Sequence, residues 1–294
     1  MTIYVLGMDY FKCCIFTQKL TSVCYILNSI LIGMRKYTII FRACDSVNSF
    51  NKSPRPFDLP KAQLIKICFL SLMDSLKGFN YRVVILGDKL SDEMINFFTS
   101  FEVEMNLGSY GNDASIRESL KIATTIDNKE WIYFCEDDYL HMPNSFSIID
   151  NFLNERNELF RQQIKPYNFS SLVNLPAKDL FIFPPDYPDR YFPRYRRHSL
   201  IVRSSDCHWR QVTNVTFTFL AKSTTVKKHL SLLKKASRKA NDSLLSRKLF
   251  GHFGFMASSI CFSPMPGLST HMHVNSMTPL RNWEKIAQDY INRI

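Results

Sequence analysis

The chain has 294 residues, of which 46% are hydrophobic, and it carries a formal net charge of +11. This composition is typical of a globular protein with a sizeable core, and it excludes collagen-like, low-complexity and wholly disordered chains. The charge excess is local, because residues 190–250 contain 15 Lys and Arg against only Asp206 and Asp242. One basic segment on a near-neutral chain indicates a local anionic partner and argues against a protein that coats nucleic acid.

Eight cysteines are spread along the chain without a CxxC pair or a Cys/His pair at zinc spacing. Several lie in apolar runs, as in Ile67-Cys68-Phe69, where a small buried hydrophobic side chain is the ordinary interpretation. The pattern predicts a reducing compartment and hence a cytoplasmic location. Sequons such as the one at Asn51 are then accidental.

Residues 11–34 are apolar overall, but Lys12 and Asn28 interrupt them, and the longest clean run is shorter than the roughly 20 residues that span a bilayer. No small-residue cleavage pattern of a signal peptide follows. We interpret residues 1–34 as a non-catalytic N-terminal extension. A weak membrane anchor and an upstream start before Met34 are also compatible with these residues.

From residue 35 onward, short β-branched and aromatic runs alternate with segments whose apolar residues recur at helical spacing. In residues 61–77, for example, Leu64, Cys68 and Leu72 share one helical face, and Ser91 is a candidate N-cap for the next helix. The strands predicted in this half are 37–44, 81–86, 101–105 and 131–135, and the helices are 61–77, 91–98 and 114–125.

This alternation predicts an α/β fold with a mostly parallel central sheet and helices on both of its faces. In such sheets ligands bind at the carboxyl ends of the strands. Further along, residues 212–220 (VTNVTFTFL) predict a strand in a smaller antiparallel C-terminal part, and residues 222–248 predict a basic helix. A charged helix of this kind is commonly just solvated, and it also suits peripheral contact with an anionic membrane or an anionic acceptor.

Three consecutive carboxylates, Glu136, Asp137 and Asp138, follow the strand predicted at 131–135. Neighbouring acids repel one another and are unfavourable in strands, so stability alone rarely selects this arrangement. Side chains two positions apart share one face of a strand, which directs Glu136 and Asp138 into the same crevice. Their oxygens suit a hard divalent ion that phosphate oxygens complete. The alternative is a solvated acidic loop that caps the next helix.

With this motif at the end of its fourth strand, the chain resembles the GT-A family of nucleotide-sugar glycosyltransferases over residues 36–150, with Glu136-Asp137-Asp138 as a variant of the acidic DXD motif. The resemblance implies a nucleoside diphosphate sugar as the donor, with Mn or Mg between its diphosphate and Asp138. It also implies that Glu136 faces the donor ribose or a metal-bound water. We assign Asp137 to the nucleotide-binding residues as well.

Two further acids follow earlier strands and match places where the family contacts the nucleotide. Asp45 lies just after the first predicted strand and Asp88 just after the second. The resemblance implies that they contact the base and the ribose. Each is also an ordinary residue for a turn that ends a strand.

The second half of the chain should supply the acceptor site and, in an inverting enzyme, a carboxylate base that takes the proton of the acceptor hydroxyl. We predict Asp206 as this catalytic base, with Trp209 under the sugar and Arg210 near phosphate. Asp186 and Asp189 are the reserve candidates, in a Pro-rich and aromatic stretch that suits sugar stacking. A salt-bridged structural role is the alternative for Asp206.

Two late histidines, His271 and His273, share one face of an extended segment, as a pair of metal ligands would. In the GT-A family a late histidine often completes the metal's protein ligands. The resemblance therefore implies His271 as the metal ligand beside Asp138, although the sequence alone does not separate the two histidines. Surface histidines without a ligand are the alternative.

These features predict a glycosyltransferase that moves a sugar to a glycan or lipid-linked acceptor without nucleic acid as a partner. We divide the chain into the extension at 1–34, a nucleotide-sugar-binding half at 35–150 and an acceptor-binding half at 151–294 of the same domain. A sugar-nucleotide nucleotidyltransferase shares the sheet, but residues 44–60 contain no Gly for a phosphate loop. A metal-dependent nuclease and a non-catalytic carbohydrate-binding protein are two further classes that the sequence leaves open.

Overall fold

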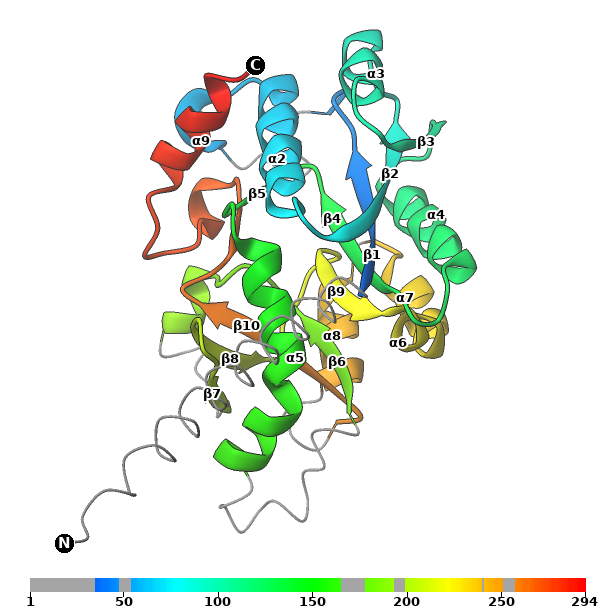
Figure 1. The fold of residues 1–294 in the computed structure, drawn as a ribbon. Coiled ribbons are helices and arrows are strands. Elements are labelled where there is room, and N and C mark those ends of the chain that lie inside the picture. The colour runs from blue at the N-terminus through cyan, green and yellow to red at the C-terminus, as the bar shows by residue number, and fades with distance from the viewer. Residues whose placement is uncertain (1–34, 48–53, 165–177, 193–198, 240, 251–256) are drawn as a thin grey trace, which may run out of the picture.

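A computed structural model describes residues 35–47, 54–164, 178–192, 199–239, 241–250 and 257–294 of the chain (Figure 1). The predicted extension at 1–34 and the end of the Pro-rich and aromatic stretch at 179–197, namely residues 193–197, lie outside the described residues. Within the described part, no helix is both long enough and apolar enough to cross a membrane.

The first part of the central sheet consists of parallel strands joined by helices. The strands are β1 (Lys36–Ala43), β2 (Asn80–Asp88), β3 (Glu104–Gly108) and β4 (Trp131–Glu136). The connecting helices are α2 (Lys61–Ser75), α3 (Asp92–Thr99) and α4 (Asn112–Thr125). The strands pair in the order β3-β2-β1-β4, and Ser91 caps α3 by accepting from the N–H of Met94, as predicted.

The second part of the chain completes the same sheet with strands of both directions. These are β6 (Asp179–Ile182), β7 (Ile201–Arg203), β8 (His208–Val212), β9 (Phe219–Lys222) and β10 (Ser259–Met265). β9 lies antiparallel between β4 and β6, β6 pairs in parallel with β10, and β8 and β7 complete the edge antiparallel. The resulting order is β3-β2-β1-β4-β9-β6-β10-β8-β7.

Helices cover both faces of the sheet because successive strand residues point to opposite sides. In β1, Ile39 and Phe41 pack with α2 and α3, whereas Ile40 packs with α4. The helices of the second half are α5 (Ser145–Ile164), α6 (Ser223–Lys228), α7 (Leu230–Ala236), α8 (Asp242–Phe250) and α9 (Trp283–Ile291). α5 lies on the face of α2, and α6, α7 and α8 lie on the face of α4 (Figure 1).

A second, two-stranded sheet lies beside the carboxyl end of β4. It pairs β5 (Tyr139–His141) antiparallel with β11 (Ser269–His271). A short 3-10 helix, η5 (Val274–Ser276), follows β11 and leads toward α9. This small sheet therefore connects the end of the parallel strands to the last part of the chain.

The structure confirms the predicted α/β class, with a mostly parallel sheet, helices on both faces and an antiparallel part in the second half. Three local predictions were wrong. The third strand lies at 104–108, whereas it was predicted at 101–105. Residues 212–220 were predicted as one strand, but they contain the end of β8, a loop and the start of β9. The chain is interrupted here because β8 pairs with β10 whereas β9 pairs with β4. The basic helix predicted at 222–248 is divided into α6, α7 and α8, and the backbone first leaves helical geometry at His229.

Candidate functional site

The small β5–β11 sheet brings the late histidines to the acidic motif. In this sheet Tyr139 is the partner of His271, and the backbone N–H of Met272 donates to the carbonyl oxygen of Asp138 over 2.8 Å. His273 follows one residue later. The cross-strand pairing thus places both histidines next to the last acid of the motif, as the sequence predicted for one of them.

Asp138, His271 and His273 form a group of potential metal ligands. The Nε2 atoms of the two histidines lie 3.2 and 3.4 Å from Oδ2 of Asp138, and the ligand atoms of the three residues all lie within 4.8 Å of one another. The His271 ring stacks against Tyr139 and against His273, with centroid separations of 4.8 and 3.9 Å. These stacking contacts hold the His271 ring in place.

Burial opposes charge on Asp138 and on His271, and their mutual attraction outweighs this effect. Desolvation alone would raise the pKa of Asp138, but the neighbouring His271 and hydrogen bonds from both histidines hold that pKa well below its usual range. In the same way, burial lowers the pKa of His271 and the Asp138 carboxylate raises it. The net change is an increase. Asp138 is therefore an anion in the folded protein, and it attracts cations.

Glu136, the first acid of the motif, faces a cation of the protein itself. Its Oε1 atom lies 2.5 Å from the guanidinium of Arg42 in β1, and its Oε2 atom accepts from the hydroxyl of Thr218 over 3.2 Å. The Glu136 side chain keeps 28% of its surface exposed. It is positioned but still accessible to a ligand.

Asp137, the middle acid, has a structural role. Its Oδ1 atom lies 2.6 Å from Nζ of Lys61, the first residue of α2, and Oδ2 accepts from the backbone N–H of Cys44 over 2.8 Å. Burial lowers the pKa of Lys61, while Asp137 and Asp138 raise it, and the net change is upward. Removing one partner of such a buried pair costs about 3–5 kcal/mol. Asp137 thus anchors α2 to the end of β1, and its assignment to the nucleotide stays a prediction.

Asp45 and Asp88 both stabilise loops at the same edge of the sheet. Asp88 is buried and accepts from the backbone N–H groups of Tyr110 and Gly111 over 2.6 and 2.8 Å, which fixes the turn before α4. Asp45 accepts from the backbone N–H and the hydroxyl of Ser91, the N-cap of α3. Both residues therefore have the role in a turn that we gave as the alternative. Their contact with a nucleotide stays a prediction.

The predicted base, Asp206, lies in the exposed turn between β7 and β8. Its Oδ2 atom accepts from Nδ2 of Asn151 in α5 over 3.0 Å. This hydrogen bond ties Asp206 to α5 rather than to the group formed by Asp138 and the histidines, and its catalytic role stays a prediction. The prediction that Trp209 lies under the sugar was wrong, because this ring is fully buried and stacks on Phe152 at a centroid distance of 4.1 Å.

The reserve candidate Asp186 is fully buried, at 0% exposure. It lies 3.7 Å from the guanidinium of Arg190 and 3.6 Å from that of Arg210, and it accepts from the hydroxyl of Tyr191. The second reserve candidate, Asp189, is partly buried in the turn that follows. The Asp186 side chain is inaccessible in this structure, which favours a structural role for Asp186. We predicted Arg210 near phosphate, and the structure instead pairs it with the Asp186 carboxylate.

Sequence reasoning missed Arg42, Lys61 and Thr218, which complete the surroundings of the acids. Arg42 lies within an apolar run (Ile39 to Ala43), and a charged residue in a buried strand indicates a buried partner. Lys61 begins a helix, where a cation opposes the helix dipole, and that also indicates a nearby acid. Both signals were present in the sequence.

No protein-family model and no curated protein sequence matches the chain. Among solved structures, TarS from S. aureus has a TM-score of 0.45 and 11% identity over 78% of this chain, which spans 35% of that TarS chain. A nucleotidyl transferase from Methanothermobacter thermautotrophicus has a TM-score of 0.43 and 7% identity, over 89% of this chain and 100% of its own. The galactosyltransferase LgtC, in complex with donor and acceptor sugar analogs, has a TM-score of 0.37 and 10% identity, over 74% of this chain and 70% of its own.

All three TM-scores are below 0.5. The three structures include a galactosyltransferase and a nucleotidyl transferase, and they do not decide between these two classes. The residues of the site must therefore decide the function.

Asp242, the first residue of α8, is a further carboxylate near the acidic motif. Burial raises its pKa from 3.8 to about 7, Glu136 adds to this increase and Arg42 opposes it. The nearby Glu136 carboxylate makes a negative charge on Asp242 still less favourable. A carboxylate that is costly to ionise and faces a site is a candidate functional group.

The raised pKa of Asp242 predicts a pH-dependent stability. Between about pH 4 and pH 7 the folded protein holds this proton more tightly than the unfolded chain does, so the free energy of unfolding falls as the pH rises through that window. Asp242→Asn removes the titration, and we expect the variant to be more stable than the wild type at about pH 8, by at most about 4 kcal/mol. Urea denaturation of both proteins at about pH 5 and pH 8 measures the difference.

The matched control is Asp289→Asn, at an exposed position of α9. This variant should follow the wild type at both pH values. Equal pH dependence of the Asp242→Asn variant and the wild type would show that Asp242 ionises normally.

Proposed function

We propose that the protein is a glycosyltransferase that moves a sugar from a nucleoside diphosphate donor to a glycan or lipid-linked acceptor with the help of a divalent metal. The observation that carries this proposal is the convergence of Asp138, His271 and His273 at the carboxyl end of β4. In an open α/β sheet this edge is where ligands bind. The charge of Glu136 contributes to the raised pKa of His271, and the Glu136 side chain is partly exposed.

The donor set fits a single metal ion. Ligand atoms about 2.1 Å from one ion, and at right angles to each other, lie about 3 Å apart. The distances of 3.2 and 3.4 Å from Oδ2 of Asp138 to the two Nε2 atoms are close to this value. Imidazole nitrogens suit transition metals, whereas Mg²⁺ prefers oxygen ligands and bound water. We therefore propose a transition-metal ion, such as Mn²⁺, over Mg²⁺, with His273 as a ligand in addition to His271.

The metal would offset the negative charge of the nucleoside diphosphate as it leaves the sugar. The chain's own residues support this role. Lys61 and Arg42 neutralise Asp137 and Glu136, whereas the side chain of Asp138 pairs with the two histidines. We propose that Glu136 binds the donor, with Asp45, Asp88 and Asp137 shaping the nucleotide side of the site.

We propose that Asp206 accepts the proton of the acceptor hydroxyl. Its side chain is exposed, and a base must be within hydrogen-bond reach of the proton it takes. The turn between β7 and β8 lies at the same edge of the sheet as the end of β4, because β10 runs in the same direction as β4 and this turn adjoins the carboxyl end of β10. Strands β9, β6 and β10 lie between β4 and β8, so the acceptor would have to extend along this edge to reach both Asp206 and the metal group.

A sugar-nucleotide nucleotidyltransferase is the second candidate function, because it would use a metal at the same edge of a similar sheet. It joins a sugar phosphate to a nucleoside triphosphate and releases pyrophosphate, whereas the proposed transferase releases a nucleoside diphosphate. The absence of Gly from residues 44–60 favours the transferase. A nuclease would instead bind nucleic acid with a steep dependence on salt.

We also propose that the protein is cytoplasmic and contacts an anionic membrane surface through α6, α7 and α8. Eight Lys and Arg side chains on or next to these helices are exposed, and one of them, Lys228, forms an ion pair with Asp179. Lysines predominate in the set, and clusters of this size suit anionic lipid headgroups. The residues are Lys222, Lys228, Lys234, Lys235, Arg238, Lys239, Arg247 and Lys248.

Asp138→Asn should remove metal-dependent nucleotide binding. For the wild type we expect one nucleoside diphosphate in a panel to raise the melting temperature with Mn²⁺ present and not in its absence, because a ligand at 100 times its Kd stabilises the fold by about 2.7 kcal/mol. The variant should show no such shift relative to its own melting temperature. Thermal-shift measurements with each nucleotide, Mn²⁺ and Mg²⁺ test this.

Asp289→Asn again serves as the control and should keep the shift. A wild type that no nucleoside diphosphate stabilises with either metal would overturn the proposed function. A shift that survives in the Asp138→Asn variant would remove Asp138 from the metal site.

Asp206→Asn should abolish sugar transfer while it leaves nucleotide binding unchanged, because the base acts on the acceptor and not on the donor. General-base catalysis contributes about 10²–10⁴-fold, so we expect a loss of this size in the transfer rate. Nucleoside diphosphate release is measured with a panel of nucleotide sugars, and pyrophosphate release with nucleoside triphosphates and sugar phosphates. Pyrophosphate as the product would establish the nucleotidyltransferase, and an unchanged transfer rate would exclude Asp206 as the base.

The double variant Lys234→Glu/Lys235→Glu should bind vesicles that contain phosphatidylserine at least about tenfold more weakly than the wild type, since each basic residue near such a surface contributes about 1 kcal/mol. Co-sedimentation with these vesicles at low and high salt measures the effect. The matched control is Lys89→Glu/Lys285→Glu, at exposed positions on other elements. Equal losses in both double variants, or binding to duplex DNA and not to vesicles, would contradict the proposed membrane contact.

A further inference from the structure

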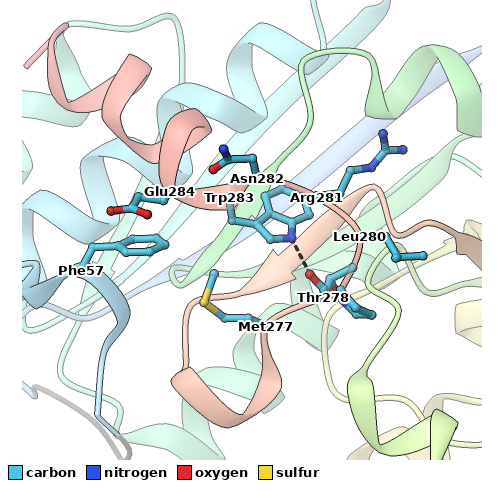
Figure 2. Close-up of a pocket in the computed structure, with 9 residues that line it drawn as sticks. Phe57, Met277, Thr278, Leu280, Arg281, Asn282, Trp283 and Glu284 are labelled. Atoms are coloured by element: carbon cyan, nitrogen blue, oxygen red, sulfur yellow. Dashed lines mark hydrogen bonds between the residues drawn. The ribbon is translucent and has the colours of Figure 1, made fainter.

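A hollow of about 730 Å³ opens between the loop that holds Phe57 and the segment from Met277 to Glu284 (Figure 2). Its volume lies in the range typical of small-molecule sites. Figure 2 shows the Phe57 ring next to Glu284, Trp283 in the middle, and Leu280 toward the other end. The Trp283 side chain is held in place, because its indole N–H donates to the carbonyl oxygen of Thr278 over 2.7 Å.

Both walls of the hollow are attached to the proposed metal group. On one side, Phe57 lies four residues before Lys61, the partner of Asp137. On the other side, Met277 lies four residues after His273. The backbone N–H of Val274 donates to the carbonyl oxygen of Pro54 over 3.2 Å and joins the two walls. A ligand in the hollow would therefore contact two segments that are close in sequence to Lys61 and to His273.

The backbone of both walls adopts an uncommon conformation. Phe57 has a φ of 62°, Asp58 of 49° and Leu280 of 66°. Bulky side chains rarely adopt positive φ, which costs of order 1–3 kcal/mol per residue and is concentrated at ligand sites. Leu280 is also 78% exposed. The surrounding structure therefore keeps Phe57 and Leu280 at the hollow against a cost in backbone energy.

The lining combines apolar faces with hydrogen-bonding groups. Phe57 is 36% exposed, and Asn282 and Glu284 are exposed beside it. Arg281 also lines the hollow, although its Nε atom is buried. A sugar ring presents a C–H face that packs on an aromatic ring and hydroxyls that bond to amide, carboxylate and guanidinium groups. A lipid tail would leave these polar groups unpaired.

We infer that this hollow binds a saccharide unit of the acceptor, with Phe57 as its stacking platform. The inference rests on the proposed function, in which an acceptor subsite is needed next to the donor site. It places acceptor recognition on the 54–60 and 277–284 segments, whereas the sequence predicted it on the aromatic stretch at 179–197.

The test is binding of a panel of methyl glycosides and disaccharides, measured by saturation-transfer difference NMR on the full chain. At least one saccharide should bind the wild type, and Phe57→Ala should weaken its binding by about tenfold, the effect of one lost aromatic contact. Mn²⁺-dependent stabilisation by a nucleoside diphosphate should be unchanged in this variant. The circular dichroism spectrum and melting temperature of Phe57→Ala verify that it folds, and Phe57→Tyr, which keeps the ring, should retain saccharide binding.

Phe192→Ala is the matched comparison, because Phe192 is another exposed phenylalanine, at 54%, in the stretch that the sequence favoured. Weaker saccharide binding in Phe192→Ala and not in Phe57→Ala would overturn the inference, as would a wild type that binds no saccharide of the panel. Loss of nucleotide binding in Phe57→Ala would overturn it too, because the hollow would then belong to the donor. If saccharide binding depends on Phe57 but no nucleotide stabilises the protein, the hollow is a saccharide site and the proposed glycosyltransferase function is wrong.

Discussion

Three neighbouring carboxylates at the end of a buried strand repel one another, and the fold accommodates them by giving each its own partner. Here the partners come from three different parts of the chain: Arg42 for Glu136, Lys61 for Asp137, and the two histidines for Asp138. Arg and Lys stay protonated over the physiological range, whereas imidazole nitrogens exchange a proton readily and bind metals. The three acids therefore differ in their partners, and Asp138 is the one that lies next to potential metal ligands.

The same pairs also connect the elements that surround the site. Arg42 joins β1 to β4, and Lys61 joins the start of α2 to the turn after β4. Pairing of β5 with β11 adds the late part of the chain. A change in any one acid therefore affects both local charge and the position of a neighbouring element, and the two effects must be separated by experiment.

The sequence predicted the first half of the fold because its signals are local. Apolar runs and helical spacing located β1, β2 and β4 within one or two residues. The strand after α3 was placed three residues early, because apolar side chains such as Phe101 and Val103 pack against the core without belonging to β3. The second half was harder, since β8 and β9 are close in sequence but pair with different strands.

For the site, the sequence correctly placed a late histidine beside Asp138, and it could not choose between two residues that share a face. It missed the roles of Arg42 and Lys61 because the choice of a partner depends on tertiary contacts. The error at Trp209 had another cause. An aromatic residue suits sugar binding, but the Trp209 ring belongs to the hydrophobic core, where it stacks on Phe152.

β9 forms backbone hydrogen bonds with β4 on one side and with β6 on the other. A late segment is thus inserted between an early strand and a middle one, and the early and late parts of the chain share one continuous sheet. A hinge that separated them would have to break these ladders. A rigid-body separation of the two halves is therefore disfavoured, and any movement at this edge of the sheet would be confined to its loops while the paired strands stay fixed.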